Sequence, residues 1–377
     1  MANLASADWS FVDADTRYLT HPIHRYSSKL IPQIPRTLIA ELSRSEDLVL
    51  DNFVGSGTTL IEANLLSRHS IGVDLNPLAC MITKAKTTPI PASILKQEYR
   101  NLLSKISHDV NPLRGQKSLD AEQITDEFME TTPAPEKLRR WYFQKDLAEL
   151  IVIKNHISCL EDKRVRNLAN VCFSEIVRKS SRAHSSYANV MLDRKARPKG
   201  KIFEYFRRQL KFGFQRVAEF SKSCKEEFLP EIICADAKKI RFLQNNCVDL
   251  IISHPPYLAA VPYAEFMLLS LLWFGIDTRK LDSRLLGGSR RKRDVSNRFL
   301  HDMREIFTEM YRILKSSGIC CVVIGNPVSH GRRVQLNSSF KNLGEETGFT
   351  FQVEIPRKRT NMRKGILRDE YILIFTR

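Results

Sequence analysis

The sequence lacks the features of a membrane, secreted or zinc-binding protein. Among its 377 residues there is no run of about 18 apolar residues, so no transmembrane helix is expected. Its eight cysteines are scattered, only Cys320 and Cys321 are close together, and no Cys-x-x-Cys pair occurs. This usage disfavours a zinc site and a disulfide framework and predicts reduced thiols. The polar segment Met1–Trp9 carries an acid and does not resemble a signal peptide, so a cytoplasmic location is expected.

The sequence is also short of acidic residues relative to basic ones. It has 59 Lys and Arg against 42 Asp and Glu, which gives a formal net charge of +17. An excess of this size is typical of proteins with a polyanionic partner, most often nucleic acid, with general solubility as the alternative. The hydrophobic content of 43% is that of a globular protein, and the chain is long enough for one large core or two modest ones.

The first chemical signal is a strand, a glycine turn and a helix in succession. Asp47–Leu50 predicts a short buried strand, and Leu60–Leu66 has apolar residues at helical spacing. Between them, the turn Asp51–Thr59 contains Gly55 and Gly57, which permit a tight turn and a close approach by a ligand. The helix that follows presents free N–H groups at its start. This combination indicates a nucleotide-type ligand site.

Two carboxylates narrow the choice of ligand. Asp74 ends a second strand, Ser70–Asp74, roughly 20 residues after the turn, where a ribose diol is usually held. The turn lacks the full Gly-x-Gly-x-x-Gly pattern, and Asp51 would repel a pyrophosphate but attract an amine. A ligand with a ribose and an amino group but no phosphate is S-adenosyl-L-methionine, which we expect as the cofactor. An ordinary βαβ unit with a tight glycine turn is the alternative.

A polar loop precedes this unit. His21–Pro35 contains three prolines and is expected to be an ordered loop, whereas residues 1–20 are expected to form a weakly structured arm. The loop residues His24, Tyr26 and Lys29 could form a wall of the ligand pocket, with a surface loop as the alternative.

A mostly helical insertion is predicted after this cofactor-binding half. From residue 89 to residue 230 the periodicity is helical and strand signals are few, and the stretch is too long for a crossover loop. We therefore expect three parts: residues 1–88 as the arm and the cofactor-binding half, residues 89–230 as an insertion that could recognise the target, and residues 231–377 as the catalytic half.

Strand patterns resume in the last part. Glu231–Asp236 predicts a strand that ends on an acid, and Val248–Ser253 predicts a buried strand that runs into His254-Pro255-Pro256-Tyr257. Two prolines cannot continue a ladder, so the chain must leave the sheet there, and at a carboxyl end the loop would border the ligand crevice. The remaining elements expected are helices at Glu265–Phe274 and Phe299–Lys315, a strand at Ile319–Gly325, and a terminal strand pair at Phe349–Pro356 and Glu370–Arg377.

The glycine turn and the Pro-Pro-Tyr loop together resemble a known family. Asp-x-Phe-x-Gly-Ser-Gly-Thr at Asp51–Thr58, paired with the Pro-Pro-Tyr loop, is similar to the amino-group DNA methyltransferases, which methylate cytosine N4 or adenine N6. Ile251–Tyr257, followed by Tyr263 and Trp273-Phe274-Gly275, is most similar to the cytosine-N4 branch. The resemblance implies an α/β, class I (Rossmann-like) methyltransferase fold with a doubly wound sheet, a terminal antiparallel strand pair and the helical insertion.

The resemblance also implies the roles of individual residues. Asp51, Phe53, Gly55 and Gly57 would line the methionine end of the cofactor, Asp74 would hold the ribose and Asp236 would lie beside the adenine. The full set of expected cofactor residues is Asp51, Phe53, Gly55, Gly57, Thr58, Asp74, Leu75, Asp236, His24, Tyr26 and Lys29.

The expected catalytic residues are Ser253, His254, Pro255, Pro256 and Tyr257. An exocyclic amine is a poor nucleophile because its lone pair is conjugated with the ring. An acceptor at the first position of the loop, with the Pro255 carbonyl, would polarise its N–H bonds, while Tyr257 would stack on a base turned out of the duplex.

His254 departs from the family pattern, which has Asp, Asn or Ser at this position. A neutral imidazole can accept a hydrogen bond and a protonated one cannot, so activity should fall at acid pH. The Ser253 hydroxyl as acceptor and a purely structural role for His254 are the alternatives.

Basic side chains in three regions are predicted to contact DNA. They are Arg178, Lys179, Arg182, Arg194, Lys195 and Arg197 in the insertion, Arg290, Arg291, Lys292 and Arg293 after a glycine pair, and Arg357 and Arg359 near the terminal strands. For the insertion, hydroxyl-rich neighbours and an aromatic suit phosphate contacts, with a solvated helical face as the alternative.

The function expected from these observations is methylation of double-stranded DNA, at cytosine N4 ahead of adenine N6, in a restriction–modification system with a cognate endonuclease or alone. No proline is followed by cysteine, which disfavours methylation at carbon 5 of cytosine. An RNA base methyltransferase is the enzyme alternative. A nucleic-acid-binding protein with an inactive cofactor fold is the non-enzyme alternative.

Overall fold

The structure is a computed structural model. It describes residue 4 and residues 7–114, 119–130, 135–185, 187, 189–258, 263–286, 294–329, 332–360 and 367–377.

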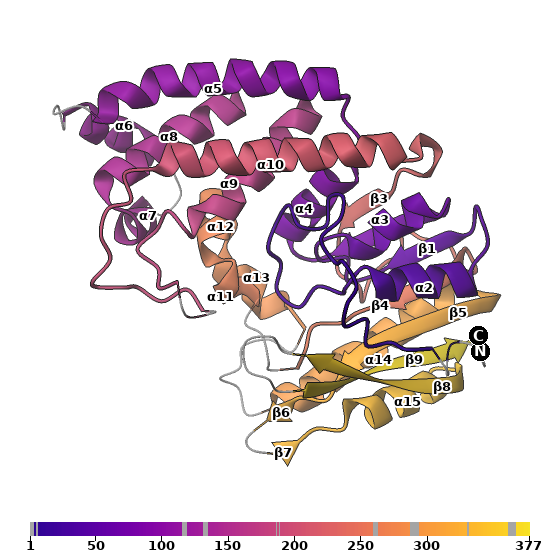
Figure 1. Cartoon of the computed structure of the whole chain (residues 1–377). Helices are drawn as coiled ribbons and strands as arrows, with labels where there is room; N and C mark the ends of the chain where they lie inside the picture. The colour runs from indigo at the N-terminus through magenta and orange to yellow at the C-terminus, as the bar shows by residue number, and fades with distance from the viewer. Residues whose placement is uncertain are drawn as a thin grey trace.

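One mixed sheet of seven strands organises the fold (Figure 1). Its order is β3-β2-β1-β4-β5-β9-β8, in which β9 runs antiparallel to β5 and to β8 while the other neighbours are parallel. The strands are β1 (Leu48–Asp51), β2 (His69–Asp74), β3 (Glu231–Cys234), β4 (Val248–Ser253), β5 (Leu314–Gly325), β8 (Thr350–Thr360) and β9 (Leu367–Thr376). This order confirms the predicted doubly wound α/β fold with a terminal antiparallel pair. The order reverses between β1 and β4, and a crevice for a ligand forms at such a switch point.

Alternation along the strands divides the core between the two faces of the sheet. Val49 and Leu250 pack with α2 (Gln33–Leu42) and α3 (Thr58–Leu65), whereas their neighbours Leu50 and Ile251 belong to the cluster on the other face. That second face is covered by α14 (Val295–Ile313) and α15 (Leu336–Glu346). Successive side chains of a strand point to opposite faces, so a short apolar run can serve two helical layers.

Helices follow β2 and continue to β3. They are α4 (Pro77–Thr87), α5 (Ala92–Arg114), α6 (Leu119–Glu130), α7 (Pro135–Trp141), α8 (Gln144–Ser158), α9 (Lys163–Val177) and α10 (Ile202–Ser223), followed by a short 3₁₀ turn at Glu226–Phe228. The Asn76 side chain accepts from the Leu78 N–H at 3.0 Å, and Pro77 takes the first helical position, so both residues favour the start of α4 here. α5 to α10 form the helical layer at the upper left of Figure 1.

The helical layer shares its hydrophobic core with the catalytic half. One buried cluster joins Phe173 of α9 to Ile82 of α4 and to Trp273 of α12 (Leu268–Trp273). The Phe173 and Trp273 rings meet edge to face with centroids 5.1 Å apart. A continuous core makes independent motion of the two parts costly, because moving them apart would expose apolar surface.

Three expectations about local structure need correction. The N-terminal arm is not weakly structured where it is described: Trp9 is buried, and the Tyr18 hydroxyl donates to Glu62 at 2.6 Å. The helix expected at Glu265–Phe274 is interrupted at Met267, which separates α11 (Tyr263–Phe266) from α12. The helix expected at Phe299–Lys315 ends at Ile313, and the strand expected at Ile319–Gly325 begins at Leu314, because the chain enters the sheet directly after α14.

The remaining short elements lie near the carboxyl ends of the strands. α13 (Thr278–Arg284) begins with Asp277, whose carboxylate accepts from the Arg279 N–H at 2.9 Å. β6 (Val328–Ser329) and β7 (Arg332–Arg333) form a separate two-stranded sheet. Within the described ranges, we find no helix with the length and apolar content that a membrane span requires.

Arg357 and Glu370 form a buried ion pair across the terminal strands. They face each other in the β8–β9 register, and both side chains are less than a tenth exposed. The Arg357 Nε also donates to the Trp9 carbonyl at 2.7 Å. This burial contradicts the expectation that Arg357 contacts DNA, since a guanidinium group held inside the protein cannot reach a phosphate.

Replacing Arg357 with methionine should lower the free energy of unfolding by roughly 3–5 kcal/mol, because Glu370 would lose its buried partner. Urea unfolding measures this loss. Arg304→Ala is the matched control, since Arg304 pairs with Glu346 while both side chains are about half exposed, and its expected cost is under about 1 kcal/mol. Equal losses in the two variants would contradict a structural role for the buried pair.

Candidate active site

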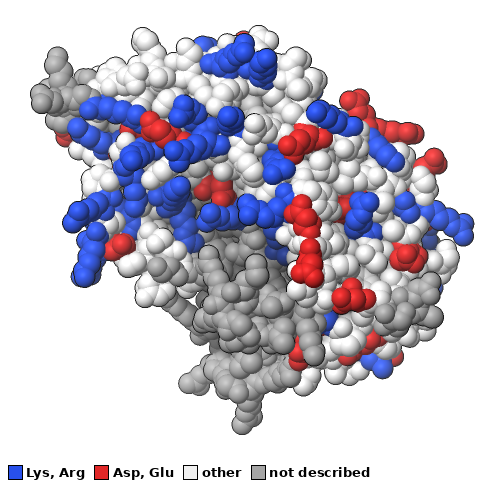
Figure 2. Space-filling view, viewed as in Figure 1, with Lys and Arg blue, Asp and Glu red and all other residues white. Residues whose placement is uncertain are grey.

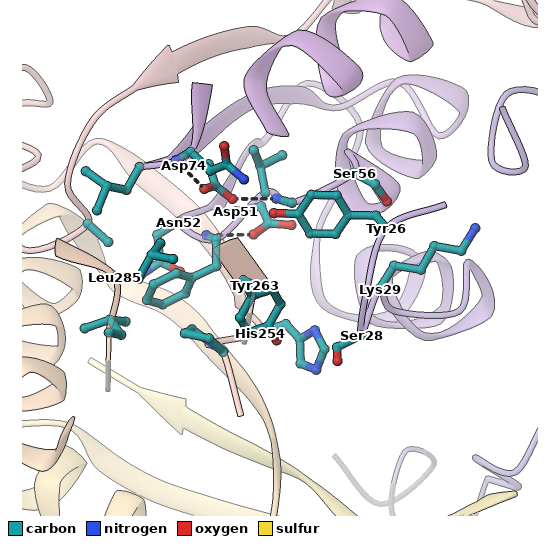
Figure 3. Close-up of a pocket in the computed structure, with 18 of the residues that line it drawn as sticks. Tyr26, Ser28, Lys29, Asp51, Asn52, Ser56, Asp74, His254, Tyr263 and Leu285 are labelled. Carbon is teal, nitrogen blue, oxygen red and sulfur yellow. Dashed lines mark hydrogen bonds between the residues drawn. The ribbon is translucent and has the colours of Figure 1, made fainter. Parts of the chain in front are cut away.

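A cavity with an empty volume of about 920 Å³ lies at the carboxyl ends of β1, β2 and β4 (Figure 3). It brings together eleven of the predicted site residues: Tyr26, Lys29, Asp51, Phe53, Gly55, Thr58, Asp74, Leu75, Asp236, His254 and Pro256. The carboxylates of Asp51 and Asp74 lie on one side of the cavity in this view, and His254 and Tyr263 lie on the other. The glycine turn and the loop after β4 therefore face one space.

The two glycines of the turn are required by its backbone. Gly55 has φ +52°, and a Cβ there would lie 3.2 Å from the ring of Tyr26. Gly57 has φ +78°, and a Cβ there would lie 2.8 Å from Cγ2 of Thr83 on α4. Both conformations are unfavourable for a residue with a side chain. The turn thus packs directly against the polar loop on one side and α4 on the other.

Gly57→Ala should destabilise the protein by more than the ~1–2 kcal/mol expected of a left-handed conformation alone. The reason is the added contact between the new methyl group and Thr83. Gly200→Ala is the matched control, because Gly200 also has a positive φ (+59°) but nothing within 4 Å of the position of a Cβ. Thermal unfolding of both variants measures the difference, and an equal loss of stability would exclude the steric contribution.

Asp74 is fixed by backbone groups at the mouth of the turn. Its Oδ2 accepts from the Gly55 N–H at 2.9 Å, and its Oδ1 accepts from the Asn76 N–H at 2.8 Å. Burial raises the pKa of Asp74 to about 6, although these hydrogen bonds oppose the shift. A carboxylate oriented in this way has lone pairs left for a diol.

Asp51 lies deeper in the same cavity. Its Oδ1 accepts from the Phe53 N–H at 3.0 Å. Burial raises the pKa of Asp51 to about 7, and the neighbouring charge of Asp74 adds to this increase while hydrogen bonds to Thr59 and Phe53 oppose it. A carboxylate that is reluctant to ionise in an empty pocket gains strongly from a cationic ligand.

Unsatisfied polar atoms around the turn also indicate a ligand. Both amide atoms of Asn52 and the hydroxyl of Ser56 are buried, line the cavity or its wall, and have no hydrogen-bond partner among the described residues. Buried polar groups are normally satisfied, so an amide left without partners beside a cavity indicates contact with a polar molecule. With two carboxylates and a glycine turn, these atoms fit a ligand that carries hydroxyl and amino groups.

Charged residues buried beneath the turn hold it in place. Glu62 of α3 is fully buried, accepts from Tyr18, binds His21 Nε2 at 2.8 Å and pairs with Arg36 at 3.1 Å. Lys86 of α4 is also fully buried, and its ammonium donates to the Ser56 carbonyl. Burial lowers the pKa of Lys86 well below its usual range. This network could not be predicted from the sequence, because neither Glu62 nor Lys86 belongs to a motif.

The loop after β4 contains a hydrogen-bonded relay. His254 Nε2 lies 3.2 Å from the Tyr257 hydroxyl, which donates to Glu370, the partner of Arg357. A carboxylate paired with arginine only accepts, so the single Tyr257 proton goes to Glu370 and the Tyr257 oxygen accepts from His254. A neutral His254 that donates from Nε2 to the Tyr257 oxygen would keep its acceptor lone pair on Nδ1.

Comparison with known proteins agrees with this geometry. A family model described as DNA methylase, for the N6 and N4 methyltransferases, matches residues 16–85, which contain the glycine turn and Asp74. The chain is 26% identical to the Type II methyltransferase M.MvaI of Kocuria varians over 76% of its own length and 66% of that protein. It is 21% identical to the Type II methyltransferase M.MjaII of Methanocaldococcus jannaschii, over 94% of this chain and 79% of the relative.

In these comparisons the chain is similar to the amino-group DNA methyltransferases. Its cofactor is S-adenosyl-L-methionine, and the cavity residues fit that molecule. Among solved structures, an S-adenosylmethionine-dependent methyltransferase from Methanosarcina mazei aligns with 90% of this chain and 96% of its own, at 9% identity and a TM-score of 0.37. The chain spans only about two thirds of the length of M.MvaI, so the activity of the whole protein is treated below as a proposal.

Five predicted site residues do not line the cavity at the carboxyl ends of β1, β2 and β4. They are His24, Gly57, Ser253, Pro255 and Tyr257. His24 is buried and binds Ser174 of α9 at 2.9 Å, so it ties the polar loop to the helical layer. The Lys29 side chain borders the cavity, but its ammonium points away and donates to the His21 carbonyl at 3.0 Å (Figure 3). Neither His24 nor the Lys29 charge is placed to contact the cofactor.

Several cavity residues were missed from the sequence. Those not predicted as site residues include Ser28, Asn52, Asn76, Tyr263, Leu285 and Leu286. Asn52 lies inside the turn motif Asp51–Thr58, between two residues that were predicted to line the cofactor site. This position could have identified it as a cavity residue. The Leu285–Leu286 segment follows α13 and is brought to the cavity only by the tertiary fold, so no local signal identifies it.

The predicted DNA-binding residues occupy different environments. Arg194, Lys195 and Arg197 are exposed on the loop between α9 and α10, where Lys and Arg side chains gather in Figure 2. Lys179 lies 4.2 Å above the Tyr205 ring and Arg182 lies 5.0 Å from the Phe143 ring centroid. Residues 290–293 and the side chain of Arg359 lie outside the described part of the chain.

Proposed function

We propose that this chain methylates the exocyclic amine of a base turned out of double-stranded DNA, at cytosine N4 in preference to adenine N6. The observation that carries this proposal is the single cavity bordered by the glycine turn, by Asp74 and by His254 and Pro256. A methyl donor held by the turn would face the loop that engages the amine. The similarity to Type II methyltransferases supports DNA as the substrate and a restriction–modification system with a cognate endonuclease as the setting.

In this proposal the cofactor supplies an electrophilic methyl group on a sulfonium. Asp74 would accept hydrogen bonds from the ribose hydroxyls, and Asp51 would pair with the amino group of the methionine end. The apolar Phe53 and Leu286 border the same space, and Asp236, which also lines the cavity, would accept a hydrogen bond from the adenine amine. These residues position the donor and exclude water from the side of the cavity opposite the catalytic loop.

The loop after β4 would activate the amine. The Nδ1 lone pair of neutral His254 would accept a hydrogen bond from the amine, which localises the lone pair of the nitrogen and favours attack on the methyl group. As the new N–C bond forms, the amine must lose a proton, and Nδ1 is the atom able to receive it. Tyr257 would hold the His254 tautomer through Nε2 and present a ring face for base stacking.

Mass spectrometry of methylated nucleosides tests the proposal. The protein is incubated with S-adenosylmethionine and mixed-sequence duplex DNA, which is then digested. N4-methylcytosine is the expected product, and N6-methyladenine would retain the mechanism but overturn the base assignment. If DNA gives neither product, the same assay with RNA tests the RNA alternative. Absence of S-adenosylmethionine binding in calorimetry would favour the nucleic-acid-binding protein with an inactive cofactor fold.

A further inference from the structure

A second cavity adjoins the cofactor cavity and opens between the helical layer and the polar loop. Its walls come from the polar loop, from α9, from the segment after α9, from α10 and from the α11–α12 region. Tyr26 and Ser27 line both cavities. We call this second cavity the basic groove. Because two residues are shared, the basic groove lies next to the cofactor cavity.

The basic groove carries a strong excess of positive charge. Its lining includes five Lys and Arg residues, Arg25, Arg178, Lys179, Lys199 and Arg208, together with His184. The one acid in its lining is Glu175, which accepts from the Arg25 backbone N–H at 2.8 Å and pairs with the Arg25 side chain at 3.1 Å. Lys and Arg side chains also gather on the face of the molecule that Figure 2 shows.

The basic residues of the groove differ in what they do. Arg178 donates to the carbonyls of Tyr187 and Asn189, so it shapes the wall. Lys199 and Arg208 make no side-chain hydrogen bond or ion pair with any described residue, and Arg208 is exposed on α10. Cationic side chains of this kind can neutralise phosphates.

The groove is also held in a fixed position relative to the catalytic residues. Gln209, the neighbour of Arg208, donates to the Ile23 carbonyl at 2.8 Å, which attaches α10 to the polar loop. His24 binds Ser174, whose hydroxyl donates to Ser270 of α12 at 2.9 Å. Side chains on such a framework can fix the register of a bound strand before chemistry occurs.

We propose that the basic groove binds the phosphodiester backbone of the target strand, next to the nucleotide whose base enters the cofactor cavity. Lys199 and Arg208 contact the phosphates, and Tyr187, which is 54% exposed beside His184, offers a ring to a neighbouring base. This inference rests on the proposed function and assigns to the helical layer the positioning of the strand. It is independent of which base is methylated.

The test compares Arg208→Glu with Arg207→Glu in the full-length protein. The two residues are neighbours on α10, both are exposed, and both substitutions change the net charge equally, but Arg207 does not line the groove. Binding to mixed-sequence duplex DNA is measured by fluorescence anisotropy over a series of salt concentrations. Arg208→Glu should weaken binding by about 10-fold or more, and Arg208→Ala should reduce the salt slope by about 1. Arg207→Glu should weaken binding by less than about threefold, with the Arg207→Ala salt slope unchanged.

The possible outcomes of this test distinguish a failure of the basic-groove inference from a failure of the proposed methyltransferase function. Equal losses for Arg208→Glu and Arg207→Glu would overturn the basic groove while leaving DNA methylation intact. If the wild-type protein binds no duplex DNA, both proposals fail together. S-adenosylmethionine affinity, measured by calorimetry, should be unchanged in both variants. A folded Arg208→Glu variant that binds DNA normally would also overturn the inference.

Discussion

Replacing His254 with alanine is expected to lower the rate of methyl transfer by roughly 10²–10³-fold, since the amine would lose the acceptor that polarises it. Affinity for S-adenosylmethionine should change little, because the groups that hold the donor lie across the cavity on Asp51 and Asp74. Single-turnover transfer to duplex DNA measures the chemical step, and calorimetry measures the affinity. Loss of activity without loss of affinity is the signature of an interaction made mainly in the transition state.

Further variants distinguish a chemical role of His254 from a structural one. His254→Asn restores an oxygen acceptor of the kind the family uses, so it should recover part of the rate lost in His254→Ala. His301→Ala alters an exposed histidine of α14 and should leave the rate unchanged. At saturating cofactor, the wild-type rate should fall at acid pH, because a protonated His254 cannot accept a hydrogen bond from the amine. A rate that stays flat from about pH 8 to about pH 5.5 would count against this role.

Replacing Asp51 with asparagine should weaken S-adenosylmethionine binding by about 10–100-fold at pH 8, because the cationic amine would lose a charged partner. The wild-type affinity should depend on pH. Asp51 has a pKa of about 7 without ligand, so it loses its charge as the pH falls through this value. The ligand amine loses its own charge above roughly pH 8. Binding should therefore be strongest between about pH 7 and pH 8.

In Asp51→Asn, the affinity for S-adenosylmethionine should no longer fall as the pH is lowered, as measured by calorimetry at several pH values. Asp13→Asn, a change to an exposed carboxylate, should leave the profile unchanged. A wild-type affinity that does not change between about pH 8 and about pH 6 would contradict the proposed pairing of Asp51 with the amine.

The same substitution should stabilise the ligand-free protein. The folded-state pKa of Asp51 is raised from 3.8 to about 7, so its contribution to stability is greatest below pH 3.8 and is lost as the pH rises to about 7. Asparagine removes this cost, and thermal unfolding at pH 8 should show a higher midpoint for Asp51→Asn than for wild type. Such a gain in stability with a loss of binding is expected where a functional site is held in a strained state.

The cofactor half of the site was largely predictable from local sequence. The chain contains in direct succession a strand, a turn with Gly55 and Gly57, a helix and a strand that ends on Asp74. The positive φ values at both glycines agree with the prediction that glycine permits a tight turn here. The loop after β4 could also be predicted from local sequence, because the chain must leave the sheet at two consecutive prolines. Parallel pairing of β1 with β4 then places the ends of both segments together.

The assignment of individual side chains was less predictable. His24, Lys29 and Arg357 carry the right chemistry for ligand contacts, yet each makes its hydrogen bonds inside the protein. For His24 and Arg357 the partner lies more than a hundred positions away, so no local pattern contains it. Lys29 donates to His21, eight residues earlier, and only the folded shape of the polar loop brings the two together. The pKa of Asp51 has the same origin, because its value depends on burial by the surrounding loops.

Hydrophobic periodicity and backbone stereochemistry over short stretches are enough to predict the fold class, the location of the cofactor turn and the location of the catalytic loop. Tertiary structure alone decided that the helical layer shares a core with the catalytic half, through contacts such as Phe173 with Trp273. The tertiary structure also places His254 within hydrogen-bonding distance of Tyr257, which donates to Glu370. It places the basic groove next to the cofactor cavity. Burial, charge neighbours and cavities are properties of groups that the chain brings together from distant positions, so they exist only once it has folded.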